Sequence, residues 1–240
     1  MSFSQILWRE KTQIILVSHL AILYGMLDTW KRSNQKRNRP QEPDYVAGLV
    51  LESTPILYNT LSAIFGQHGV HLSLTTVYCH QTPKVQFAGM NKTSCEVGDL
   101  LLAHVHTLRS GCVTRNALLY QAKMSSKQPH KIGSKEMDQL MLYTNWPPFN
   151  YYNSYPLAGQ RDIIPKLPHT GAQYMLIDDR SPNDPQRGLS GLSGTYPIGS
   201  CMPDQYLYDH NHLAAELFDF FLLRSGRGFV DKSTSSSMDG

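Results

Sequence analysis

The sequence predicts an α/β fold in which a central mixed β-sheet is flanked by helices. Two helical segments come first and three strand-like segments follow. A helix, a strand and a last helix complete the order. The chain has 240 residues, of which 41% are hydrophobic and 17% are charged, so it can form one domain with a full core. A net charge of +3 is too small to indicate a polyanion partner by itself.

The first predicted helix covers 4–30 and includes the most apolar part of the chain, TQIILVSHLAILYGMLDTW. Gln13, His19 and Asp28 interrupt this window, which falls short of the ~20 apolar residues that a membrane span needs. We therefore expect a buried or amphipathic helix, with a membrane anchor as the alternative. The basic run KRSNQKRNRP that follows predicts a solvated linker, or an arm that contacts phosphates.

The second helical region is predicted from Asp44, which can act as its N-cap, through DYVAGLVLESTPILYNTLSAIF. Pro55 cannot lie inside an undistorted helix, so this helix either kinks there or restarts with Thr54 as a cap. Periodicity and turn residues predict the later elements. These are strands at 70–79, 99–106, 117–124 and 173–178, helices at 134–145 and 212–223, and a long loop at 179–208.

The four cysteines, Cys79, Cys95, Cys112 and Cys201, are far apart and form no CxxC pair. This spacing indicates neither a zinc site nor a disulfide framework. It predicts a protein of a reducing compartment, and we expect a cytoplasmic location.

Three polar side chains stand out in the hairpin CEVGDLLLAHVHTLRSGCVTRNALLYQAKMSS. Because side chains alternate along a strand, Gln121 and Lys123 share a face, and Asp99 opens the neighbouring strand close to them. Mg²⁺ takes oxygen ligands, which Asp99 and the Gln121 carbonyl can supply, and Lys123 would then stand beside a metal-bound water. The alternative is that these residues simply end two strands.

This arrangement resembles the PD-(D/E)xK superfamily of nucleases, which share a restriction-endonuclease-like core. The matching parts are Glu52 in VLES, Asp99 in EVGDLL, Gln121 and Lys123 in LLYQAKM, and the helix at 134–145. The QxK form is similar to the Mrr-like branch of defence nucleases. The resemblance implies Mg²⁺ or Mn²⁺ as cofactor, with Asp99, Gln121 and Glu52 as metal ligands. We therefore expect an N-terminal helix and basic linker (1–43), a nuclease-like domain (44–230) and, from the low-complexity sequence STSSSMDG, a disordered tail (231–240).

Two features depart from the family pattern. Gly98 replaces the proline before Asp99, and Gln121 replaces an acid, which removes a negative charge from the metal site. A second acid is therefore needed, and Glu52 and Glu96 are both candidates. Gln139, on the helix after the QAK strand, either faces this site or faces water.

The resemblance implies that the substrate is DNA, cleaved by a metal-activated water, and that the protein acts in bacterial defence against foreign DNA. Lys127, Lys131 and Lys135 are candidate phosphate contacts, or else ordinary solvated charges. Cleavage of a duplex needs two sites, so we expect a homodimer or a partner subunit that recognises the target. The rival prediction is a non-catalytic module that keeps the fold and binds nucleic acid or protein.

Overall fold

A seven-stranded mixed sheet forms the centre of the computed structural model, which describes residues 1–36, 39–153, 159–164, 166, 171–182, 184 and 197–230. Its strands lie in the order β1-β4-β5-β9-β10-β12, and β13 also pairs with β5. The strands are β1 (Val77–Tyr78), β4 (Leu100–Thr107), β5 (Val113–Met124), β9 (Ala172–Ile177), β10 (Ile198–Cys201), β12 (Asp209–His212) and β13 (Arg227–Gly228). Helices flank this sheet, so the predicted α/β class is confirmed.

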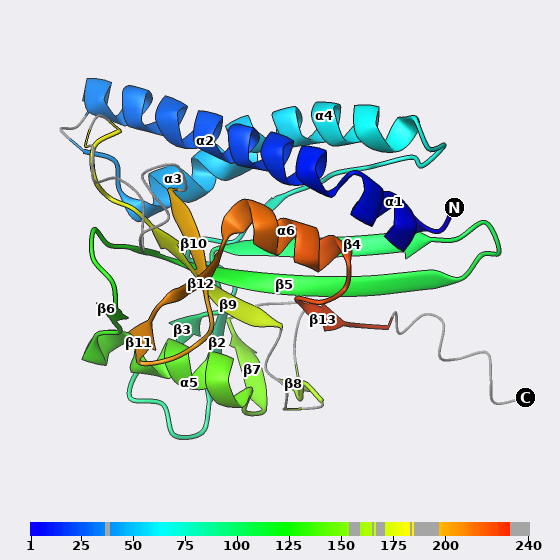
Figure 1. Cartoon of the computed structure of the whole chain (residues 1–240). Helices are drawn as coiled ribbons and strands as arrows, with labels where there is room; N and C mark the ends of the chain where they lie inside the picture. The colour runs from blue at the N-terminus through cyan, green and yellow to red at the C-terminus, as the bar shows by residue number, and fades with distance from the viewer. Residues whose placement is uncertain are drawn as a thin grey trace, which may run out of the picture.

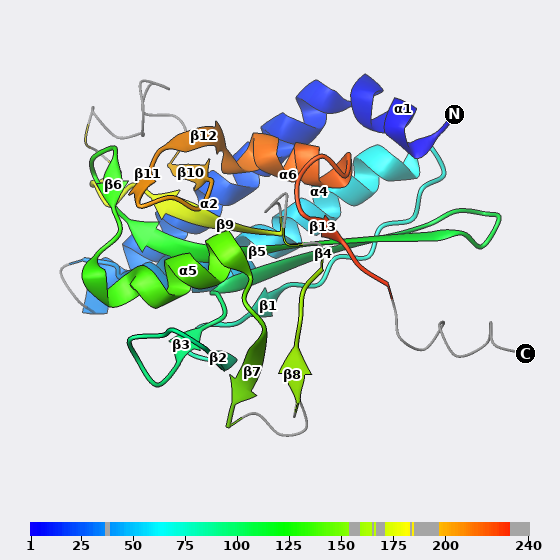
Figure 2. The same ribbon diagram turned by 90° about the horizontal axis from the view of Figure 1, so that it is seen from below.

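Strands β4 and β5 form the predicted hairpin, and its tip extends past the other strands (Figures 1 and 2). Strand β9 then pairs in parallel with the second half of β5, while the remaining pairs are antiparallel. All six residues of β9 are buried, as expected for a parallel strand covered on both faces.

Five helices cover one face of the sheet (Figure 1). They are α1 (Phe3–Arg9), α2 (Lys11–Lys36), α3 (Glu42–Gly48), α4 (Thr54–Gly66) and α6 (Leu213–Phe221). The other face carries α5 (Met137–Asn145), the 3₁₀ turn Ser134–Glu136 and a small sheet of strands β3-β2-β7-β8. These strands are β3 (Cys95–Glu96), β2 (Lys84–Phe87), β7 (Phe149–Tyr152) and β8 (Gln160–Arg161); β6 (His130–Lys131) pairs separately with β11 (Tyr206–Leu207).

Alternation along β5 divides the core between the two faces of the sheet. Leu118, Tyr120 and Ala122 pack with the helical layer, whereas Leu119 packs with α5 and the small sheet. Gln121 and Lys123 share the parity of Leu119, so they lie on the α5 face.

The N-terminal segment differs from the predicted helix and linker. The basic run mostly continues α2, which reaches Lys36, and Asp28 and Arg32 form an ion pair of 2.7 Å along it. Ile22 and Met26 of α2 share one core with the strands of the sheet. Residues 1–36 and 39–43 therefore belong to the same body as the sheet, and residues 37 and 38 of the predicted linker lie outside the described part.

Helix α2 is long and apolar enough to cross a membrane, judged by length and composition alone. Within the structure, 44% of its most apolar window is buried. Buried residues such as Ile14 and Met26 belong to the protein core, which supports the buried-helix alternative.

The second helical region begins at Glu42, two residues before the predicted start, and Asp44 accepts a hydrogen bond of 2.8 Å from the Gln41 N–H. A π-helical turn, Leu49–Ser53, separates α3 from α4. Helix α4 restarts at Thr54 with Pro55 in its first turn, where a missing N–H is tolerated.

The prediction of a strand at 70–79 is wrong for most of its length, since only Val77–Tyr78 pairs with the sheet. The predicted loop at 179–208 contains β10 and β11, and residues 183 and 185–196 of it lie outside the described part. The predicted disordered tail, 231–240, also lies outside it.

Candidate active site

Asp99 is held rigidly at the start of β4 and is 1% exposed. Its backbone N–H donates to the carbonyl of Tyr120 at 2.8 Å, and its carbonyl accepts from the N–H of Cys79 at 2.9 Å. The preceding residue, Gly98, is confined: a Cβ there would lie 2.7 Å from the Tyr143 hydroxyl. The packing of α5 against this segment therefore favours glycine at position 98.

The two carboxylate oxygens of Asp99 have different surroundings. Oδ2 accepts hydrogen bonds from the Gln121 side-chain amide and, at 2.8 Å, from the Ala122 N–H. Oδ1 lies 3.3 Å from Nδ1 of His80. One oxygen is thus occupied by the neighbouring strand, and the other faces a titratable side chain.

Helix α5 fixes this arrangement from the opposite side. The Gln139 amide donates to the side-chain carbonyl of Gln121 and, at 3.2 Å, to the backbone carbonyl of Glu96. The Tyr143 hydroxyl donates to the Val97 carbonyl at 2.7 Å, and burial raises the pKa of Tyr143, which keeps it a donor. Of the two orientations predicted for Gln139, the structure therefore has the one that faces the site.

The contacts of Gln121 differ from its predicted role as a metal ligand beside Asp99. Its NH₂ group faces Asp99, and its carbonyl oxygen is turned to Gln139. The reason is that Asp99 is an acceptor and Gln139 a donor, which fixes the direction of the amide between them. In this arrangement Gln121 orients the carboxylate of Asp99.

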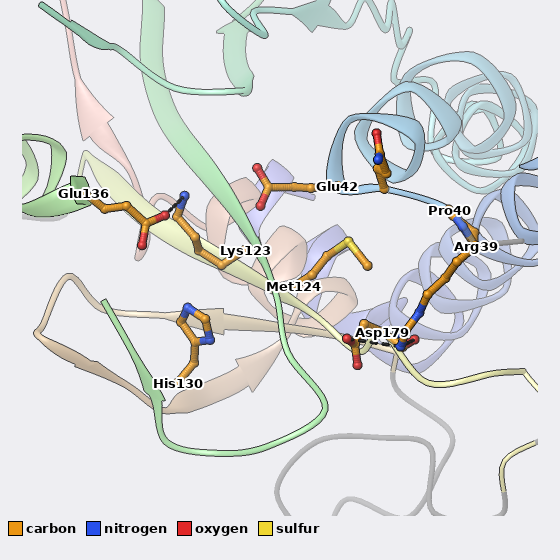
Figure 3. Close-up of a pocket in the computed structure, with 9 residues that line it drawn as sticks. Arg39, Pro40, Glu42, Lys123, Met124, His130, Glu136 and Asp179 are labelled. Carbon is orange, nitrogen blue, oxygen red and sulfur yellow. Dashed lines mark hydrogen bonds and ion pairs between the residues drawn. The ribbon is translucent and has the colours of Figure 1, made fainter. Parts of the chain in front are cut away.

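Lys123 lies beyond Gln121 on the same face and borders an open cavity of about 370 Å³. Its ammonium group is 2.7 Å from a carboxylate oxygen of Glu136. Figure 3 shows these two side chains directed toward each other, with His130 beside them. Burial acts to raise the pKa of Glu136, but the hydrogen bond and charge of Lys123 outweigh it and lower that pKa. Lys123 therefore lies on the face that alternation along β5 predicts, and its charge is paired with that of Glu136.

Glu42, which the sequence reasoning missed, is the acid that α3 contributes to this cavity (Figure 3). Burial raises its pKa to about 7; the charges of Asp99 and Glu136 also raise it, and Lys123 opposes them. The charges of Asp99, before β4, and of Lys123, near the end of β5, therefore both act on Glu42. An acid in the first turn of the helix after Pro40 was the available signal, and the predicted start at Asp44 hid it.

Glu52 does not take the predicted place of the second acid. It lies on the π-helical turn and forms an ion pair of 3.2 Å with Arg32 of α2. Ten residues of helix separate it from Glu42, which corresponds to about 15 Å along an axis. The start of α3 lies beside the end of β5. Glu42 is therefore the acid near this end, and Glu52 is not.

Glu96, the other predicted candidate, lies close to Asp99. Its Oε2 is 3.9 Å from Nδ1 of His80, and one ligand atom from each of His80, Glu96 and Asp99 lies within 4.8 Å of the others. His80 was not predicted as a site residue, because it follows a segment that the sequence assigned to a strand. The structure therefore brings two further acids, Glu42 and Glu96, towards Asp99.

The three predicted phosphate contacts are exposed and follow β5 along the chain. Lys127 lies in the loop after β5, the ammonium of Lys131 lies 5.8 Å from the ring centre of Tyr206, and the Lys135 carbonyl accepts from the Lys92 ammonium. The side chains of all three remain open to solvent, so their role in DNA binding stays a prediction.

Comparison of the chain with protein-family models, with curated proteins and with solved structures gave no significant match. The resemblance to the nuclease superfamily therefore depends on the motif residues and their arrangement alone.

Proposed function

We propose that this protein is a divalent-metal-dependent endonuclease that hydrolyses phosphodiester bonds in DNA. The observation that carries the proposal is the convergence of a buried carboxylate, Asp99, an ammonium, Lys123, and a second carboxylate, Glu42, at one end of the central sheet. Lys123 of β5 and Glu42 of α3 line an open cavity, and Asp99 directly precedes β4. Perturbed acids beside a cleft are typical of catalytic sites.

The donor set suits a divalent cation such as Mg²⁺ or Mn²⁺. Glu42 is partly buried at the cavity, and burial raises its pKa to about 7, so a bound cation would stabilise its ionised form. Asp99 would hold the ion through Oδ1, and Glu42 would add negative charge nearby. When bound, such an ion activates water and neutralises charge on a phosphate.

Lys123 and Gln121 have separate roles in this proposal. The ammonium of Lys123, at the cavity wall, would bind a phosphate oxygen and stabilise the negative charge that develops during hydrolysis. Gln121 holds Asp99 in place through its amide, and Gln139 holds Gln121 in turn. A carboxylate oriented in this way presents Oδ1 to a ligand with little rearrangement.

The proposed substrate and setting depend on the resemblance. Exposed Lys127, Lys131 and Lys135 would contact DNA phosphates near the cavity. Duplex cleavage would require a homodimer or a partner subunit that recognises the target. All four cysteines are free, which supports a cytoplasmic protein, and the QxK form supports a role in defence against foreign DNA.

A non-catalytic binding module is the second candidate, favoured by two observations. Gln121 supplies no negative charge where the family has an acid, and Lys123 is already paired with Glu136. Such a module would bind nucleic acid or protein through the same surface without hydrolysis.

Cleavage of supercoiled plasmid with Mg²⁺ and with Mn²⁺ tests the proposal. We expect the wild type to nick and linearise the plasmid, and Asp99→Asn, Glu42→Gln and Lys123→Ala to lose at least about 100-fold in rate. Glu52→Gln is the matched control, because it removes a carboxylate that pairs with Arg32 outside the site. Equal rates for all variants would exclude the assigned residues. DNA binding without any cleavage would favour the binding module.

A further inference from the structure

An imidazole lies against Oδ1 of Asp99, the carboxylate oxygen that does not contact β5. Nδ1 of His80 is 3.3 Å from Oδ1 of Asp99 and 3.9 Å from Oε2 of Glu96. We propose that His80, Glu96 and Asp99 together bind a first-row transition-metal ion such as Mn²⁺, and that His80 makes this site prefer that ion over Mg²⁺. The reaction at this ion depends on the proposed function, but its binding does not.

The spacing of the three donor atoms matches a shared ion. Ligand atoms at about 2.1 Å from an octahedral ion lie about 3.0 Å apart when adjacent and about 4.2 Å apart when opposite. The two distances from Nδ1 of His80, 3.3 and 3.9 Å, lie between these two values, and one donor atom from each residue lies within 4.8 Å of the others. Small rotations of His80 and Glu96 would complete the coordination.

The hydrogen bonds of Asp99 leave Oδ1 as the oxygen that can bind a metal. Oδ2 already accepts from Gln121 and Ala122, so it is directed into β5. The carbonyl of Gln121, the ligand that the family pattern would supply, is held by Gln139. His80 therefore takes the place that Gln121 leaves, on the other side of the carboxylate.

The three residues are fixed relative to one another by the backbone. Cys79, which precedes His80, donates its N–H to the carbonyl of Asp99, and the carbonyl of Glu96 accepts from Gln139. The side chains of His80 and Glu96 are 23% and 27% exposed, whereas that of Asp99 is 1% exposed. The site thus has one immobile ligand at its base and two at its mouth, where an ion and its waters can enter.

The nitrogen donor determines which ion is favoured. Mg²⁺ binds oxygen ligands and retains its waters, whereas imidazole is a common ligand of first-row transition metals. The thiol of the nearby Cys79 donates to the Val77 carbonyl. The cysteine therefore does not compete as a ligand, and the donor set is one nitrogen and two carboxylates.

The test is Mn²⁺ binding to chelator-treated full-length protein, measured by electron paramagnetic resonance. We expect one bound Mn²⁺ with a nitrogen coupling in the electron spin-echo spectrum, and loss of that coupling in His80→Gln. His80→Ala should weaken Mn²⁺ binding by at least about tenfold and change Mg²⁺ binding by less than about threefold. His71→Gln is the control, because His71 is exposed and outside this cluster.

Bound Mn²⁺ without nitrogen coupling, or with a coupling that survives in His80→Gln, would overturn this inference. So would a wild type that binds no Mn²⁺. The plasmid assay separates these results from the proposed function. Cleavage with Mg²⁺ and no nitrogen coupling overturns the role of His80 alone. Nitrogen coupling without any cleavage keeps His80 as a ligand and overturns the nuclease.

Discussion

The ammonium of Lys123 lies 2.7 Å from a carboxylate oxygen of Glu136, so the cation that ends β5 is already paired in the structure. This pairing places an acid at the cavity where the proposal needs a phosphate. The Glu136 side chain is 33% exposed and the Lys123 side chain is 11% exposed. The acid can therefore move away into solvent more easily than the lysine can.

Replacing Glu136 with glutamine should strengthen DNA binding. The change removes one negative charge from the cavity and leaves Lys123 free to contact a phosphate, so we expect affinity to rise about two- to fivefold at low salt. Fluorescence anisotropy in a chelator measures this without cleavage. Glu52→Gln removes the same charge elsewhere and should have a smaller effect. An unchanged or weaker affinity in Glu136→Gln would contradict this role.

Gly98→Ala should destabilise the protein by about 1–3 kcal/mol, because overpacking a confined site forces its neighbours to move. The new Cβ would lie 2.7 Å from the Tyr143 hydroxyl and 2.8 Å from Cδ1 of Leu119. Denaturant unfolding measures the change. Gly66→Ala is the control, since a Cβ there meets nothing within 4 Å. Tyr143→Phe should partly rescue Gly98→Ala, and strictly additive effects would argue against this contact.

Hairpin geometry allowed much of this site to be predicted from the sequence. Alternation and register act between neighbouring residues, so they placed Gln121 and Lys123 on one face and Asp99 beside them. The α/β class followed from the same local patterns. The start of α3 was harder to predict, because its cap is Gln41, which is not a usual N-cap residue. The helix was predicted to start at Asp44, and Glu42 was therefore not considered.

His80 was missed because its position depends on pairing between distant parts of the chain. In the small sheet, Lys84 of β2 pairs with both Glu96 and Tyr152, and the strands have only two to four residues. Strands this short carry too little periodic signal to be recognised, and pairing across almost 70 residues leaves none in the local sequence. The segment that holds His80 beside Asp99 therefore required the structure.

The raised pKa of Glu42 predicts a pH dependence of stability in the metal-free protein. The folded state binds a proton up to about pH 7, whereas the ordinary value is 4.5, so stability should fall as pH rises from 4.5 to 7. Because one pKa unit corresponds to about 1.4 kcal/mol, a rise from 4.5 to about 7 corresponds to a loss of up to about 3.5 kcal/mol. Glu42→Gln should remove this decline, as shown by urea unfolding at pH 5 and pH 8. A decline of equal size in the variant would contradict it.

Glu216 of α6 should give stability the opposite pH dependence, so that the protein becomes less stable as pH falls. It is 3% exposed and accepts hydrogen bonds from Gln173 and Ser225, with His210 3.3 Å away. Burial acts to raise its pKa, but these partners outweigh burial and lower the pKa to about 2. Its contribution is therefore complete above pH 4.5 and is lost as pH falls towards 2.

Glu216→Gln should accordingly destabilise the protein by about 2–3 kcal/mol at pH 7, since a buried charged acceptor is removed from satisfied donors. Thermal unfolding of both proteins at pH 7 and pH 3 measures the effect, and the difference should shrink at pH 3. A difference that is independent of pH would show that Glu216 contributes through packing and not through its charge.

DNA binding and cleavage by one variant, Lys123→Ala, test the central claim most directly. If the protein is a nuclease, the wild type cleaves plasmid with Mg²⁺ or Mn²⁺, and Lys123→Ala loses at least about 100-fold in rate. In chelator, the variant should still bind DNA within about threefold of the wild type, since other basic residues contact phosphates. Equal cleavage by both proteins, or no cleavage by the wild type under any of these conditions, would contradict the assignment of this site as a nuclease.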